Sequence, residues 1–78
     1  MTPELIHTTD AGVQYFVVPG LATERGGNFC FDVDPAGRVV NHNDYPALCA
    51  LRDAGVLTEP VPFAFYYRPG AIRVDTTQ

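Results

Sequence analysis

Short runs in which apolar and polar residues alternate make up most of the chain. The runs cover residues 4–9, 13–18, 28–32, 38–41, 63–68 and 71–75. Alternation over four to eight residues is typical of a β-strand with one buried face. Short turns rich in Gly, Pro and Asp separate neighbouring runs, so the pattern predicts three β-hairpins.

One segment, residues 44–54, has helical spacing instead. Its apolar residues fall on one face of a helix: Ala47, Leu48, Leu51 and Ala54. Asn43 and Asp44 are both candidate N-caps, because their short side chains can accept hydrogen bonds from the first turn. Gly55 supplies a residue that can adopt the left-handed conformation that ends many helices. The stripe is narrow and partly alanine, which suits close packing on a flat sheet.

The pattern therefore predicts an α+β fold: one antiparallel sheet of five or six strands, with the helix packed on one face. Residues 13–18 are apolar on both faces, so this strand is expected to be central or covered on both sides, and to end at Pro19-Gly20. Residues 24–27 form either a simple connection or a binding loop. Residues 58–62 are expected to be a stiff linker. At 78 residues, the chain is expected to be a single domain spanning 1–78.

The composition excludes several kinds of chemistry. The chain contains no Lys and no Ser, so it has no Schiff-base or P-loop lysine and no serine nucleophile. It contains no apolar run long enough for a membrane span and no signal-peptide pattern. Two cysteines are too few for a disulfide scaffold, so both thiols are expected to be reduced, in the cytoplasm. Arg without Lys, together with abundant Ala, Gly, Pro and Val, hints at a high-GC bacterial or phage gene.

Candidate metal and catalytic residues lack the spacing that their chemistry requires. Zinc-type ligands occur only singly along the chain, at Cys30, Cys49, His7 and His42. Residues 32–37 begin like a calcium loop, but Ala36 occupies a ligand position and Asn43 stands where the bidentate Glu belongs. A Cys49 nucleophile with His42 as base and Asp44 as orienting group remains an alternative, although Cys49 lies inside the helix. We therefore expect no metal, no cofactor and no enzyme activity.

The prediction of function rests on the net charge of −4, which is a weak signal. An acidic surface disfavours direct binding to nucleic acid or to an anionic membrane, and favours a basic partner. An ordinary solvated acidic surface is the plain alternative. If the acidic side chains share one face, they can form a binding stripe with exposed tyrosines as anchors. The candidate partner-binding residues are Asp32, Asp34, Asp44, Asp53, Tyr45 and Tyr66.

The hypothesis is a small acidic, non-enzymatic protein-binding module that occupies a basic nucleic-acid-binding surface of a larger protein or ribonucleoprotein. Its most specific form is a phage-encoded inhibitor of the anti-CRISPR or anti-restriction type, acting in the cytoplasm of a bacterial host. Two alternatives remain: a structural or assembly subunit that forms a homo-oligomer through a strand edge, and a small Cys- or metal-dependent enzyme. Clustering of the carboxylates on one face would favour the first hypothesis.

Overall fold

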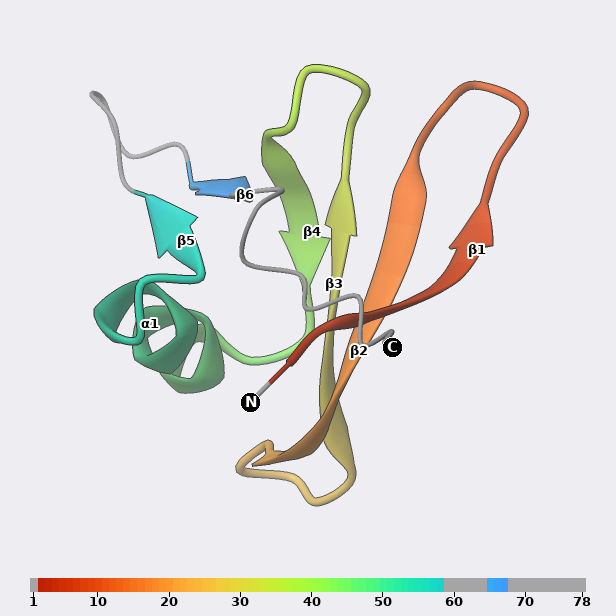
Figure 1. Cartoon of the computed structure of the whole chain (residues 1–78). Coiled ribbons are helices and arrows are strands. Elements are labelled where there is room, and N and C mark those ends of the chain that lie inside the picture. Colours follow the sequence, from red (N-terminus) through yellow and green to blue (C-terminus); the bar gives the residue numbers. More distant parts are fainter. Residues whose placement is uncertain (1, 59–64, 68–78) are drawn as a thin grey trace, which may run out of the picture.

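A computed structural model describes residues 2–58 and 65–67 and shows an α+β fold (Figure 1). A four-stranded antiparallel sheet has the order β1-β2-β3-β4, and β5 and β6 form a separate two-stranded sheet. In chain order, the elements are β1 (Glu4–Thr8), β2 (Gln14–Ala22), β3 (Asn28–Val33), β4 (Val39–His42), α1 (Tyr45–Asp53), β5 (Leu57–Thr58) and β6 (Tyr66–Tyr67). The predicted class is confirmed, whereas a single sheet of five or six strands is only roughly matched.

The first two predicted hairpins form the four-stranded sheet. β2 is central, as expected, and pairs with β1 on one side and with β3 on the other. The prediction that Pro19-Gly20 ends this strand is wrong, because β2 continues to Ala22 through a register shift after Val18. Gly20 adopts a φ of 87° in this irregular part, and the following Leu21 still packs against the core. The chain therefore bends at Gly20 without leaving the sheet.

The helix has the predicted start and stop. Asp44, rather than Asn43, is the N-cap, and its carboxylate accepts a hydrogen bond from the backbone N–H of Ala47. At the other end Gly55 has a φ of 81°. Its N–H donates to the carbonyl of Arg52, and the next N–H donates to the carbonyl of Leu51. This pair of bonds is a Schellman motif, which ends the helix and turns the chain back toward the core.

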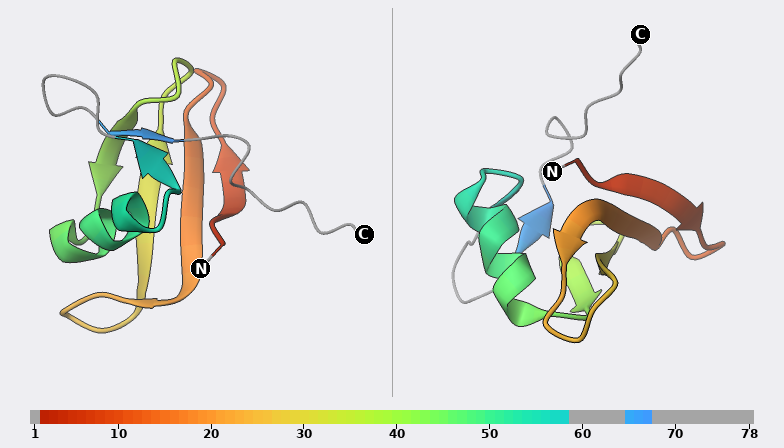
Figure 2. Two further views of the ribbon diagram at one scale, coloured as in Figure 1. Left: turned by 60° about the vertical axis from the view of Figure 1, so that its left-hand side comes forward. Right: turned by 90° about the horizontal axis from the view of Figure 1, so that it is seen from below.

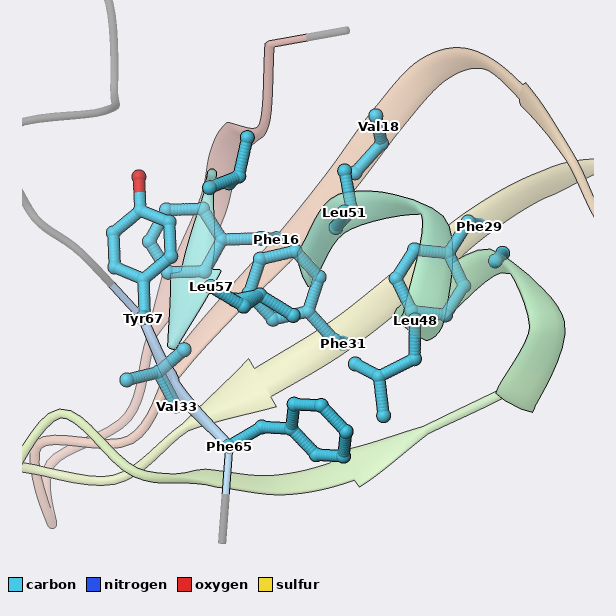
Figure 3. Packing of buried hydrophobic residues seen from close by; sticks show 12 residues of the cluster. Phe16, Val18, Phe29, Phe31, Val33, Leu48, Leu51, Leu57, Phe65 and Tyr67 are labelled. Atoms are coloured by element: carbon cyan, nitrogen blue, oxygen red, sulfur yellow. The ribbon is translucent and has the colours of Figure 1, made fainter. Parts of the chain in front are cut away.

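The core lies between the sheet and a layer formed by α1, β5 and β6, which cover the same face of the sheet (Figure 2). Apart from Pro3, every buried hydrophobic side chain of the described residues belongs to one cluster (Figure 3). Its members are Phe16, Val18, Phe29, Phe31, Val33, Ala47, Leu48, Leu51, Val56, Leu57, Phe65 and Tyr67. Ala54, which was predicted to share the helix face, is exposed, because it is the C-cap residue.

Aromatic rings occupy the centre of this cluster. The ring centroids of Phe16 and Phe31 are 5.2 Å apart, and Tyr67 lies 4.8 Å from Phe16. Phe29 extends the group, at 5.7 Å from Phe31. These are ordinary contact distances for packed aromatic pairs. The alternation predicted for residues 28–32 is therefore confirmed, because Phe29 and Phe31 both face the core.

Of the third predicted hairpin, the structure describes only residues 65–67, where β6 pairs with a segment outside that hairpin. β6 pairs with β5, which begins two residues after Gly55 and ends at Thr58, the first residue of the expected linker. Leu57 is 2% exposed, so burial of this side chain draws its strand into the core. Residues 59–64 and 68–78, which include the expected last strand at 71–75, lie outside the described residues.

Candidate functional site

The turn between β3 and β4 is built around Asp34. One of its carboxylate oxygens accepts hydrogen bonds from the backbone N–H groups of Ala36 and Arg38, at 3.0 and 2.9 Å. The other lies 3.1 Å from a guanidinium nitrogen of Arg38. The Arg38 backbone bond, with smaller contributions from the Arg38 charge and the Ala36 bond, lowers the pKa of Asp34 below its ordinary value. This carboxylate is therefore ionised and already held by its own turn.

Asp32 lies two residues earlier, on the sheet face opposite the core. It is paired directly with Tyr15 on β2 and with Asn41 on β4, and Tyr15 is paired with His7 on β1. Directly paired residues of antiparallel strands share a face, so these four form one row across the sheet. Asn41 donates to the Asp32 carboxylate at 3.4 Å, and the His7 and Tyr15 rings are 5.6 Å apart.

The turn between β1 and β2 lies beside the turn between β3 and β4 (Figure 1). A side-chain carbon placed on Gly12 would meet the Pro35 ring at 3.0 Å, so the two turns are in close contact. Asp10 is exposed in the first of these turns. Three aspartates therefore lie at this end of the sheet, which we call the turn end: Asp10, Asp32 and Asp34.

Asp44 has a structural role at the opposite end of β3. Besides capping α1, its carboxylate accepts a hydrogen bond from the backbone N–H of Glu24 at 3.3 Å. Glu24 lies in the loop between β2 and β3, where Thr23 bonds to both Gly26 and Gly27. Asp44 thus connects the start of the helix to the tip of this hairpin.

The remaining candidate residues lie away from the turn end. Asp53 ends the helix and contacts the guanidinium of Arg52 at 3.4 Å. Tyr45 is 57% exposed at the helix start, where its ring lies 6.3 Å from that of His42. Tyr66 is half-buried in β6. β3 alone spans six residues, so roughly 20 Å separates Asp34 from the region of Asp44.

The structure therefore brings together two of the four candidate aspartates, Asp32 and Asp34, and adds Asp10 to them. Asp10 was missed because it was assigned only to a hairpin turn. A signal for it was present: when four strands follow one another as a meander, the first and third turns lie at the same end of the sheet. Asp44 and Asp53 do not join this group.

The residues considered for metal or thiol chemistry remain apart. Among residues 2–58 and 65–67, no group of three or more His, Cys, Asp or Glu side chains could hold a metal ion. Cys30 lies on β3 and Cys49 on α1, and both are free and half-buried. In this part of the chain, the ring contact of His42 is with Tyr45, and the hydrogen bonds of the Asp44 carboxylate are with backbone N–H groups.

Neither the helix nor a comparison with known proteins indicates a function. Within the described residues, the single helix is too short and too polar to cross a membrane. Comparison of the chain with models of known protein families, with curated proteins and with solved structures finds no significant match.

Proposed function

We propose that the protein is a small non-enzymatic protein-binding module whose acidic turn end contacts a basic surface of a larger partner. The observation that carries this proposal is the gathering of Asp10, Asp32 and Asp34 where two turns meet. The chain is acidic, with nine acidic residues and five arginines. Opposite potentials across an interface raise association rates and select among partners.

The charges at the turn end are only partly neutralised. Among the described residues, the ion pairs join Arg38 to Asp34 and Arg52 to Asp53. Asp10 and Asp32 form no ion pair with any residue in this part of the structure. Asp34 is held by backbone hydrogen bonds of its turn and by the Arg38 guanidinium, so its carboxylate is already oriented and loses little conformational entropy on binding. Asp10 is exposed and Asp32 half-buried, so an Arg or Lys of a partner can approach these two carboxylates from solvent, whereas the Asp34 side chain is only 16% exposed.

In its most specific form, this module is a phage-encoded inhibitor that blocks a basic nucleic-acid-binding surface of a host defence complex, in the cytoplasm of a bacterial host. The acidic balance of the chain supports this form, because such a surface is built to attract phosphates. The same chemistry predicts no direct binding to nucleic acid, and the expected partner is a protein or ribonucleoprotein.

The test is capture of partners from a bacterial lysate by the immobilised full-length protein, followed by elution with increasing salt. A partner held by the turn end should be released as salt screens the charges. The Asp32→Asn, Asp34→Asn double variant should capture less of it. Both changes keep the size of the side chain, and the amide oxygen introduced at position 34 can still accept the two backbone hydrogen bonds of the turn.

The matched control is the Glu24→Gln, Asp53→Asn double variant, which removes the same charge away from the turn end. Full capture by the control and reduced capture by the Asp32, Asp34 variant would support the proposal. Equal loss in both variants would mean that net charge, and not the turn end, attracts the partner. Capture that is insensitive to salt would contradict the proposal altogether.

A further inference from the structure

The strand β1 forms an edge of the four-stranded sheet and is exposed along its whole length. All five of its residues are exposed, including two large aliphatic side chains, Leu5 at 48% and Ile6 at 61%. On one side β1 pairs with β2. On its outer side, no hydrogen bond joins residues 4–8 to any other element that the structure describes. An exposed edge of this kind is a template for pairing with another strand.

A bulge in β1 decides which of its side chains share a face. Leu5 is paired with Phe16 and His7 with Tyr15, so Ile6 is an extra residue between them. Glu4 is paired with Val17. Since Val17 and Tyr15 are two residues apart on β2, they share a face, and Glu4 and His7 therefore share it too. In a regular strand, residues 4 and 7 would point to opposite faces.

From this arrangement we propose that a second copy of the chain adds to β1 by antiparallel pairing about a two-fold axis between Leu5 and Ile6. In this register, Glu4 of each copy lies opposite His7 of the other, and Leu5 lies opposite Ile6. The pairing thus matches a carboxylate with an imidazole and an aliphatic residue with an aliphatic residue. Such directly opposite pairs are the units that stabilise a sheet. The result is one continuous eight-stranded sheet.

The dimer should be weak, because a five-residue strand pair buries less than the roughly 1,600 Å² of a standard interface. We expect a dissociation constant on the order of 0.1–1 mM. The competing interpretation is that the bulge and the charged residues of β1 prevent pairing with a second copy. Bulges and charged residues are devices that protect strand edges, so in that interpretation the protein is a monomer at any concentration.

The experiment is sedimentation equilibrium of the full chain from about 10 μM to about 1 mM, a range that brackets the expected constant. The expected result is a mass that rises from 8.5 kDa toward twice that value. A mass that stays at that of the monomer up to about 1 mM overturns the proposal.

The other edge strand supplies a matched control. Val40 is the extra residue of a bulge in β4 and is 49% exposed, so it resembles Ile6 in position and exposure. Ile6→Glu should abolish dimerisation, whereas Val40→Glu should leave it unchanged. Circular dichroism of both variants verifies that they fold. Loss of the dimer in both variants, or in Val40→Glu alone, overturns the assignment to β1.

The register is tested by changing the sign of the charge at His7. His7→Arg places a permanent cation opposite Glu4 of the second copy and should tighten the dimer several-fold. His7→Glu places two carboxylates opposite each other and should weaken it. Damage to the fold would weaken the dimer in both variants, so effects of opposite sign identify the register. Equal effects in the two variants would overturn the proposed register.

Discussion

The two edges of the four-stranded sheet carry the same local feature but have different surroundings. In β1 and in β4, a bulge inserts one exposed aliphatic residue, Ile6 or Val40. The start of β4 is covered, since the Val39 N–H donates to the carbonyl of Phe65 at 2.7 Å, and Arg38 bridges to Tyr66. β1 has no such cover among the described residues. A bulge alone does not decide whether an edge is available.

The difference follows from the path of the chain. The helix comes directly after β4, and its Schellman stop directs the chain back over the sheet toward β5 and β6. The segment 65–67 then pairs beside the residues that open β4, where the Tyr67 N–H donates to the carbonyl of Gly37. The segment that covers this edge also buries its Phe65 and Tyr67 side chains in the core, so the same burial stabilises the cover. The edge at β1 involves no comparable burial.

The largest effect on stability is expected when Leu→Ala is made on the helix side of the sheet rather than at the open edge formed by β1. Leu51, on the helix that leads to the covered edge, is fully buried, whereas Leu5 at the open edge is 48% exposed. Leu51→Ala should lower the free energy of unfolding by about 2–5 kcal/mol, because it leaves a cavity. Leu5→Ala should cost less than about 1 kcal/mol. Urea denaturation of both variants checks this, and equal losses would mean that β1 is as well packed as the helix side.

A smaller effect is expected at Asn43, which covers the edge of β3 beyond the end of β4. Its side chain accepts from the Cys30 N–H at 3.0 Å and donates to the carbonyl of Asn28 at 3.3 Å. Asn43→Ala should therefore cost about 1–2 kcal/mol, as two hydrogen bonds are lost. The control Asn41→Ala removes one long, exposed bond to Asp32 and should cost about 0.5 kcal/mol or less. Thermal unfolding distinguishes them, and a larger loss at Asn41 would contradict this assignment.

The smallest expected effect concerns Tyr67, in the strand that covers β4. Its hydroxyl is buried without a hydrogen-bond partner among the described residues. Because an unsatisfied buried polar group is destabilising, Tyr67→Phe should raise the free energy of unfolding by about 1 kcal/mol. A clear loss of stability in this variant would reveal a partner for the hydroxyl.

The same residue predicts a pH dependence. Burial raises the pKa of Tyr67 to about 12. An unfolded tyrosine titrates near 10, so between about pH 10 and 12 the unfolded state loses its proton first and stability falls as pH rises. Below pH 10, both states are protonated and no dependence arises from this group. The Tyr67→Phe variant should lose less stability across this range. The chain has no Lys to titrate there, and an unchanged slope would contradict the prediction.

Local patterns were sufficient for the elements that depend on near neighbours. The helix limits followed from Asp44 and Gly55, because capping involves residues within one turn. The inward face of β3 followed from alternation, since a strand buries every second side chain. The central position of β2 followed from its two apolar faces. The covering of the core by one amphipathic helix was predictable for the same reason.

Only the tertiary structure decided which distant segments pair. β5 is two residues long and carries no periodic signal, and its pairing with β6 depends on the buried Leu57 and Tyr67 packing into a cluster drawn from the whole chain. The positions of the aspartates were decided in the same way, because the contact of two turns places Asp10 at the same end of the sheet as Asp34, while Asp44 is bound toward the other end of β3. Alternation and capping act over a few residues, whereas pairing partners are selected by the total burial that the complete fold achieves.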